Sequence, residues 1–280
     1  MLAAAALQSV PMNTPSLVLS SRTGPILRLA LNRPAARNAL SEALMAALQS
    51  ALDDASTDNS RVVVIAAEGP AFCAGHDLKE MTAHRQAADK GAAAFAALFA
   101  QCARLMQTIV RHPKPVIAQV HGVATAAGCQ LVASCDLAVA SSAASFATPG
   151  VNIGLFCSTP MVALSRNLSR KHAMEMLLTG EAVSAAQAWH LGLVNRVATP
   201  ETLEDETMKL AALIASKPRA TVKRGKEAFY RQLELGLGEA YDYAARVMTE
   251  NMLHSEAEEG IGAFLDKRKQ HPLSPTGGEG

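Results

Sequence analysis

The spacing of apolar and polar residues changes several times along the first 160 residues of the chain. After a turn at residues 23–25, apolar residues recur at every second position, so residues 16–32 are predicted to form two strands around that turn. Ser41 then precedes Leu44, Leu48 and Leu52, which are spaced by one helical turn. This spacing predicts an amphipathic helix that Ser41 caps at its N-terminus.

The alternation of strands and helices continues further along the chain. The apolar runs at residues 61–69 and 114–122 predict buried strands, and residues 92–111 predict a long helix between them. Strands that alternate with helices favour parallel pairing with right-handed crossovers. The pattern therefore predicts an α/β fold.

After about residue 160 the pattern is helical throughout. Ser184 is predicted to open one of these helices, and Gly180 and Gly192 are each predicted to end one. This part of the chain has apolar faces that it can hardly bury alone, which favours oligomerisation. The predicted organisation is a flexible leader at 1–14, an α/β core at 15–200, a helical region at 201–269 and a disordered tail at 270–280.

Composition narrows the range of partners. Of 280 residues, 49% are hydrophobic but only 4% aromatic, so the core must consist mainly of small aliphatic side chains. The formal net charge of +1 predicts neither nucleic acid nor a membrane surface as the main partner. Five cysteines without a CxxC pair, and no His/Cys group with ligand spacing, predict neither disulfides nor a metal. We therefore expect a cytoplasmic protein.

Four segments place small residues where a backbone can approach a ligand closely. They are residues 32–40, 71–81, 122–129 and 145–160. The second is predicted to pass as a strand through Ala74 and Gly75 and to enter a short helix at Asp77. The second and third segments each lead into a helix N-terminus with unpaired N–H groups. If the two ends converge, they form an oxyanion hole, which is a pair of N–H donors for a carbonyl oxygen that becomes negative.

The sequences of these segments resemble the crotonase superfamily, the enoyl-CoA hydratase/isomerase fold. The four stretches are "LNRPAARNALS", "AFCAGHDLKEM", "AAGCQLVASCDLAVAS" and "FATPGVNIGL", and the resemblance extends over residues 16–269. It implies a core of repeated ββα units with a helical C-terminal region for oligomerisation. It also implies a homotrimer or a dimer of trimers that acts on acyl-CoA, with coenzyme A as part of the substrate and no separate cofactor.

The resemblance also implies roles for individual residues. The two amides of the oxyanion hole fall on His76 and Ala127. The C-terminal helix that carries Phe264 and Lys267 often reaches the nucleotide of a neighbouring subunit, and Lys79 is a candidate for phosphate. The full set of implied coenzyme-binding positions is Arg37, Ala39, Ala74, Asp77, Leu78, Lys79, Gly128, Phe264 and Lys267.

The chain differs from the family's sequence pattern at the positions of the catalytic acids. Hydratases of the family carry one glutamate at the place of Gln130 and another at the place of Gly150. A further acid of dienoyl-CoA isomerases falls near Ser158. General acid or base catalysis contributes about 10²–10⁴-fold per group, so standard two-glutamate hydration is not predicted.

Two functions stay open on this basis. In the first, an enzyme stabilises a thioester enolate and moves protons through a water held by Gln130 or through the side chains of His76 or Asp77. In the second, the protein binds acyl-CoA without turning it over. Cys129 and Cys157 flank the motifs as possible nucleophiles, although a free cysteine is more often a small core residue.

Overall fold

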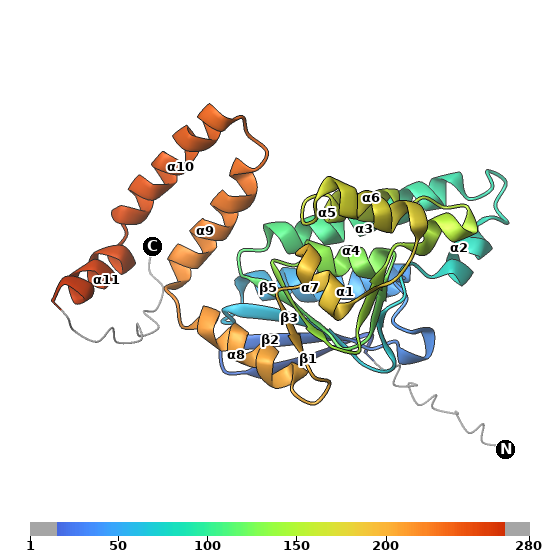
Figure 1. Ribbon diagram of the computed structural model, residues 1–280, viewed down its shortest axis with the longest axis horizontal. Coiled ribbons are helices and arrows are strands. Elements are labelled where there is room, and N and C mark those ends of the chain that lie inside the picture. The colour runs from blue at the N-terminus through green and yellow to red at the C-terminus, as the bar shows by residue number, and fades with distance from the viewer. Residues whose placement is uncertain (1–15, 267–280) are drawn as a thin grey trace, which may run out of the picture.

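Repeated units of two strands and a helix build most of the structure (Figure 1). The computed structural model describes residues 16–266, so the predicted leader at 1–14 and tail at 270–280 lie outside the described residues. The units place successive strands in two different sheets. The predicted α/β architecture is confirmed.

The larger sheet has six strands in the order β1-β2-β3-β5-β7-β10. All neighbouring pairs are parallel except β1 with β2, which form the hairpin predicted around residues 23–25. The parallel pairing predicted from the alternation of elements is confirmed. Its strands are β1 (Val18–Thr23), β2 (Ile26–Leu31), β3 (Val62–Ala67), β5 (Val116–Val120), β7 (Leu137–Ser141) and β10 (Arg196–Ala198).

A second sheet of four short strands has the order β4-β6-β8-β9. Its strands are β4 (Ala71–Cys73), β6 (Val123–Thr125), β8 (Ser145–Ala147) and β9 (Val183–Ser184). The predicted strand through Ala74 and Gly75 is wrong, because β4 ends before them and Gly75 turns the chain with φ +89°. Because β4, β6 and β8 are neighbours, three of the four motif segments run side by side.

The helices begin and end where local chemistry dictates. Ser41 accepts a hydrogen bond from the Leu44 N–H as predicted, and Ser184 forms a reciprocal capping box. The helices are α1 (Glu42–Thr57), α2 (Leu78–His84), α3 (Ala92–Arg111), α4 (Ala127–Ser134), α5 (Ser158–Leu164), α6 (Arg170–Thr179), α7 (Ala185–Leu191), α8 (Leu203–Ala215), α9 (Arg219–Gln232), α10 (Leu237–Met252) and α11 (Ser255–Leu265). Short 3₁₀ turns cover Pro34–Ala36 and Pro149–Ile153.

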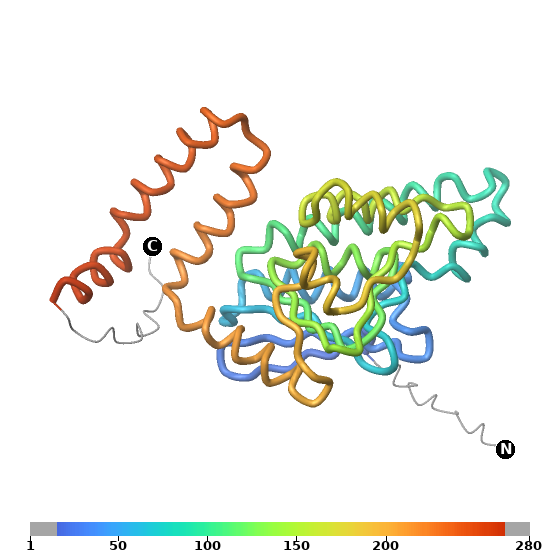
Figure 2. Tube along the Cα trace, in the orientation of Figure 1, coloured from blue at the N-terminus to red at the C-terminus, as the bar shows by residue number. Residues whose placement is uncertain are grey.

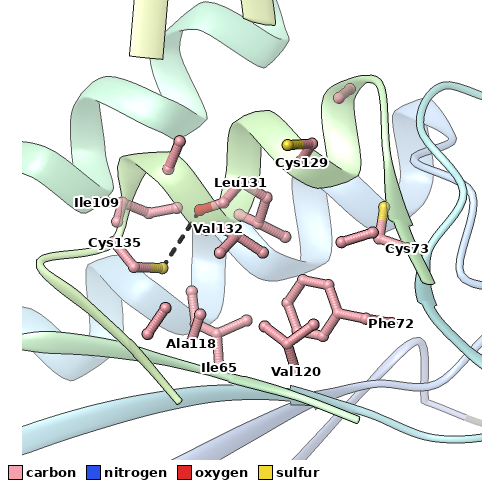
Figure 3. Close-up of a cluster of buried hydrophobic side chains, with 14 of the residues drawn as sticks. Ile65, Phe72, Cys73, Ile109, Ala118, Val120, Cys129, Leu131, Val132 and Cys135 are labelled. Atoms are coloured by element: carbon pink, nitrogen blue, oxygen red, sulfur yellow. Dashed lines mark hydrogen bonds between the residues drawn. The ribbon is translucent and has the colours of Figure 1, made fainter. Parts of the chain in front are cut away.

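The hydrophobic core lies on both faces of the larger sheet. Along β3, Val63 and Ile65 point to the face covered by α1, α3 and α4, whereas Val62 and Val64 point to α8. Figure 3 shows the first face, where Leu131 and Val132 of α4 lie above sheet residues. Alternate positions of one strand are thus buried on opposite sides, as in a parallel sheet covered by helices.

Helix α3 is long and apolar enough to cross a membrane by length and composition, and no other helix among the described residues is. Its buried side chains, which include Leu98, Leu105 and Ile109, belong to the core cluster shared with α1 and α4. We therefore interpret α3 as a core helix.

Helices α9, α10 and α11 extend away from the sheets as an arm (Figures 1 and 2). None of the three helices has a buried residue, although α8 before them packs on the sheet. Lys226 of α9 holds the arm to the core through an ion pair of 2.7 Å with Asp136. The division of the chain near residue 200 remains a prediction.

Candidate active site

Backbone hydrogen bonds join the first two motif segments. The Ala74 N–H donates to the Arg37 carbonyl oxygen over 3.0 Å. The Leu40 N–H donates to the Gly75 carbonyl oxygen over 2.7 Å, and the Leu40 carbonyl oxygen accepts from the Asp77 N–H over 3.3 Å. Three bonds within four residues fix the position of the chain around His76.

Asn38 is the buried residue on which this contact depends. It has no exposed surface and a left-handed backbone with φ 53°. Its Nδ2 donates to the carbonyl oxygens of Glu68 and Ala71, both over 2.8 Å, and its Oδ1 accepts from the Arg33 N–H over 2.8 Å. We did not predict this role. The signal in the sequence is an asparagine in a loop, a residue type that tolerates positive φ.

Two glycines bring the third segment against the second at van der Waals distance. A Cβ on Gly128 would lie 2.2 Å from the Cys73 carbonyl oxygen, closer than real atoms approach. A Cβ on Gly75 would lie 2.9 Å from the Ala126 Cβ and 3.4 Å from the Ala127 nitrogen. The residue directly before His76 therefore contacts the start of α4.

The amides of His76 and Ala127 are both free of acceptors among residues 16–266. Ala127 is the first residue of α4, where no preceding turn supplies a carbonyl oxygen. The His76 N–H also makes no hydrogen bond, since the bridge to Leu40 uses only groups of Gly75 and Asp77. Two unpaired N–H groups thus lie on touching segments, one of them at the positive end of a helix.

Ala126 carries backbone strain at this point. It precedes α4 with φ 50° and ψ −117°, a conformation that costs a residue other than glycine roughly 1–3 kcal/mol. Its N–H donates to the Ala147 carbonyl oxygen, and its own carbonyl oxygen accepts from Gln130, both at about 3 Å. These bonds hold the strained turn that orients the Ala127 amide.

The imidazole of His76 is packed rather than solvated. Both ring nitrogens are buried without a well-formed hydrogen bond among the described residues, and the ring lies edge-on to Phe99 of α3 at 5.6 Å between ring centroids. Burial lowers the pKa of His76 and outweighs the opposing effect of the Leu40 backbone, so the ring is neutral near pH 7. Neutral imidazole has one nitrogen able to accept a proton.

Gln130 is buried in the first turn of α4. Only 4% of its surface is exposed, and its Oε1 lies 3.9 Å from the Cys102 sulfur. Its amide nitrogen makes no hydrogen bond within the described part of the chain. An amide in this place offers a donor and an acceptor but does not exchange protons at neutral pH.

Gly150 leaves no room for a side chain. A Cβ there would lie 2.3 Å from the Leu155 carbonyl oxygen and 2.9 Å from the Cys157 sulfur. The Leu155 N–H donates to the Gly150 carbonyl oxygen over 2.9 Å, which closes the loop over this position. Any side chain at position 150 therefore requires this loop to shift.

Asp77 has a structural role on both of its oxygens. Its Oδ1 accepts from the N–H groups of Lys79 and Glu80 as the N-cap of α2, and its Oδ2 pairs with Arg33 at 2.6 Å. Burial raises the pKa of Asp77, but the hydrogen bonds from Arg33, Glu80 and Lys79 outweigh it and leave the pKa lowered. A carboxylate in this state is a poor proton donor.

The cysteines near the motifs are inert thiols. Burial raises the pKa of Cys129 to about 12 and also raises that of Cys157. Thiols with raised pKa values are protonated at neutral pH, and the thiolate is the nucleophile. Both residues act as core packing.

The expected coenzyme-binding residues fall into two groups. Around the first two segments, Arg37, Lys79 and Leu78 are exposed, and neither cation pairs with a described residue. Phe264 lies on α11 and is 78% exposed, at the opposite end of the molecule from α2 (Figure 1). Lys267 lies outside the described residues. Ala39, Ala74 and Gly128 are buried or half-buried beside the free amides.

No group of three or more potential ligand side chains (His, Cys, Asp or Glu) lies close enough to hold a metal ion within residues 16–266.

Comparison with known proteins gives a consistent result. Residues 21–272 match the family described as enoyl-CoA hydratase/isomerase. The human mitochondrial enoyl-CoA hydratase domain-containing protein 3 is 51% identical over 87% of this chain and 79% of its own length. The Escherichia coli 2,3-dehydroadipyl-CoA hydratase is 34% identical over 90% of this chain and 97% of its own length. The crystal structure of an enoyl-CoA hydratase from Mycobacterium smegmatis superposes with a TM-score of 0.87 at 53% identity, covering 91% of this chain and 98% of that one.

The comparison corrects one expectation from the sequence. Relatives from human, mouse and rat that are 46–51% identical are named as mitochondrial, which contradicts the cytoplasmic location expected from the cysteine pattern. Free thiols indicate a reducing compartment, and they do not distinguish the cytosol from the mitochondrial interior.

The matched family covers nearly all of the described residues, and the relatives and the fold agree with it. The chain belongs to the enoyl-CoA hydratase/isomerase family, the crotonase superfamily that its four motifs resemble.

Proposed function

We propose that the protein binds an acyl-CoA thioester and stabilises its enolate through the N–H groups of His76 and Ala127. The observation that carries the proposal is that neither amide has an acceptor within residues 16–266, and that their two segments are held together at Gly75 and Gly128. When a proton leaves the α-carbon, negative charge develops on the thioester oxygen. A preorganised donor at that oxygen contributes about 10²–10³-fold to such a reaction.

Proton transfer in this proposal does not use two glutamates. Gln130 and Gly150 supply neither an acid nor a base, and Asp77 is committed to Arg33 and the cap of α2. The remaining carriers are a water held by the free amide nitrogen of Gln130 and the neutral imidazole of His76. The family relationship supports the substrate class, and the reaction itself is our inference.

The coenzyme would run along the loops that contain Arg37, Ala39 and Ala74 and past Leu78. The unpaired charges of Arg37 and Lys79 suit its phosphates. We assign Phe264 and Lys267 to the nucleotide of a neighbouring subunit in a homotrimer or dimer of trimers. The exposed apolar surface of the arm supports such an assembly. No separate cofactor enters this proposal.

A second function has specific support. The protein would bind acyl-CoA without turnover, and the absence of a side chain at Gly150 together with the amide at Gln130 favours it. The free amides would then bind the thioester oxygen without an enolate forming.

Purified protein with crotonyl-CoA separates the two functions. Loss of the enoyl absorbance in the intact protein, reduced by His76→Ala or Gln130→Ala, supports the enzyme. His76→Ala removes the ring and keeps the backbone amide, so it tests the ring alone. Hydration that both variants leave unchanged contradicts the proton carriers, and tight binding without turnover of several acyl-CoAs supports the binding protein.

A further inference from the structure

A basic pocket lies away from the motif segments. We define it by its five cationic side chains, and it encloses a cavity of about 120 Å³. Among the described residues no acidic side chain lines it. We propose that this basic pocket is a binding site for a small oxyanion of the phosphate type. The five residues are Arg61, Lys114, Lys217, Arg219 and Lys223.

The basic pocket and the motif segments lie at opposite ends of the strands of the larger sheet. Arg61 directly precedes β3 and Lys114 lies just before β5, and these two strands are parallel. The basic pocket is therefore at the N-terminal ends of the strands. The motif segments at 71–81 and 122–129 follow the C-terminal ends of the same strands. The site is distinct from the one proposed for the thioester.

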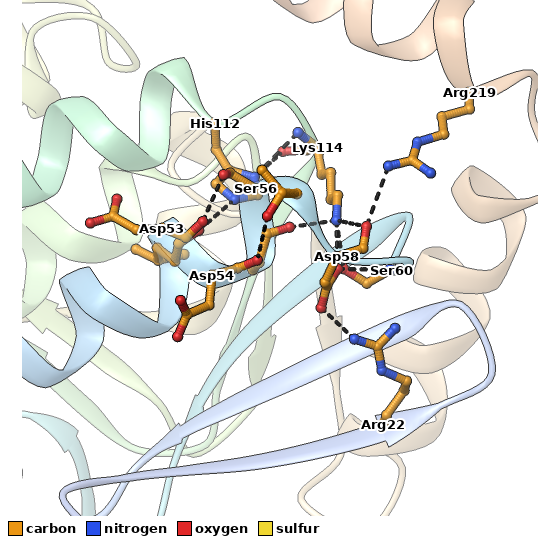
Figure 4. Close-up of polar contacts among 12 residues, drawn as sticks. Arg22, Asp53, Asp54, Ser56, Asp58, Ser60, His112, Lys114 and Arg219 are labelled. Atoms are coloured by element: carbon orange, nitrogen blue, oxygen red, sulfur yellow. Dashed lines mark hydrogen bonds and ion pairs between the residues drawn. The ribbon is translucent and has the colours of Figure 1, made fainter. Parts of the chain in front are cut away.

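The cations of the basic pocket outnumber the carboxylates that contact them. Asp58 pairs with Lys114 at 2.6 Å and also with Arg22 outside the pocket (Figure 4). Arg219 donates to the backbone carbonyl oxygen of Asp58 over 3.4 Å, and Arg61 donates to that of Lys217.

Other acids near the pocket are committed elsewhere. Asp136 pairs with Lys226, and Glu256 accepts from the first N–H groups of α9. The side chains of Lys217 and Lys223 have no partner within the described part of the chain. Two of the residues that line the cavity therefore carry a positive charge that no carboxylate among residues 16–266 neutralises.

The size and chemistry of the basic pocket select the class of ligand. The cavity of about 120 Å³ leaves room for a tetrahedral oxyanion together with several waters. Arginine offers a planar fork of donors that fits phosphate oxygens, and lysine adds a point charge. The partly fixed side chains of Arg61 and Arg219 supply preorganised donors, and Lys217 and Lys223 supply charge. The donors of Lys114 are already taken by groups of Ala55, Asp58 and Ser60.

The crowding of charge also acts on Lys114. Burial lowers the pKa of Lys114, Asp58 opposes this shift, and Arg219 and Arg22 add to it. An anion in the basic pocket would relieve this repulsion.

The test uses the full chain without coenzyme A. We expect inorganic phosphate to raise the midpoint of thermal unfolding saturably, and sodium chloride at equal ionic strength not to do so. The double variant Lys217→Ala/Lys223→Ala should weaken phosphate binding, measured by calorimetry, by roughly tenfold. Lys171→Ala, an exposed lysine on α6, is the matched control and should bind as the parent does.

Further measurements separate the ligand sources and the two sites. Competition by glycerol phosphate identifies a site open to phosphate esters, and its absence identifies one for the free ion. Acyl-CoA binding should be equal in the double variant and the parent, so the thioester proposal can fail independently. Equal protection by phosphate and chloride, or equal phosphate affinity in the double variant and the parent, overturns the proposal.

Discussion

One side of the candidate active site depends on backbone groups, and the other depends on side chains. On one side, the amides of His76 and Ala127 belong to the backbone and are held by glycine contacts and hydrogen bonds. On the other side, the positions where the resemblance places the family's acids hold Gln130 and Gly150, which carry no titratable proton. A backbone donor persists whatever side chain it bears, whereas an acid is lost with one substitution. In our proposal, this difference explains how the fold keeps the backbone donors without the acids.

The largest effect is expected where Gly128 holds the segments of the two backbone amides together. Gly128→Ala places a Cβ 2.2 Å from the Cys73 carbonyl oxygen, so the two segments must separate. We expect a loss of about 3 kcal/mol of stability, measured by chemical denaturation, together with loss of acyl-CoA binding.

Gly225→Ala is the matched control for this change. Gly225 lies within α9 with open space around it and should gain about 0.5–1 kcal/mol. Equal stability changes in the two alanine variants would contradict the close packing.

The next largest effect is an expected gain of hydration activity at position 130, where the resemblance places an acid. Gln130→Glu changes no volume and restores a titratable group in a buried turn, where desolvation raises the pKa of a carboxyl. We expect crotonyl-CoA hydration to rise by about 10²-fold. A variant that binds acyl-CoA as the parent does, with no rise in hydration, would show that an acid here does not reach the substrate.

Gly150→Glu should not produce the same gain. The Leu155 carbonyl oxygen occupies the space of its Cβ, so the loop at 149–157 must shift. We expect a loss of about 1–3 kcal/mol in thermal or chemical unfolding and no increase in hydration. A stable variant with raised hydration would contradict this expectation and show that only the side chain at 150 was missing.

The smallest effect concerns Asp77 and depends on pH. Asparagine can replace the cap of α2 but not the charge that faces Arg33, so Asp77→Asn isolates the ion pair. Because the folded protein lowers the pKa of Asp77, the ion pair stabilises fully above the unfolded value of 3.8 and less as pH falls through the folded value.

Denaturant unfolding at several pH values measures this contribution. We expect the parent to exceed Asp77→Asn by about 1 kcal/mol at neutral pH. The difference should begin to shrink only below about pH 4, and the two proteins should converge at pH values below the lowered pKa of Asp77. A difference in stability that stays constant down to low pH would contradict the ion pair as its source.

Much of the fold was predictable from the sequence because its signals are local. The cap by Ser41 and the helix ends at Gly180 and Gly192 follow from patterns within a few residues, and the structure confirms them. The parallel pairing follows from the alternation of strands and helices, and it is also confirmed. The second sheet was not predictable, because strands of three residues such as β4 and β6 are too short to show an alternation.

The site was predictable only in part, for a different reason. Motif residues indicated where small side chains allow close approach, but the hydrogen bonds of Asn38 cross about thirty residues of sequence. The strain at Ala126 and the pairing of Arg33 with Asp77 also arise from contacts between segments. Such contacts leave no periodic pattern in a single chain.

The most direct measurement of the central claim is a crystal structure of the full chain with a bound acyl-CoA. The account predicts the thioester oxygen about 2.7–3.1 Å from the amide nitrogens of both His76 and Ala127. A thioester oxygen that contacts neither amide, or an amide of this pair bonded to a protein acceptor in the complex, would contradict it.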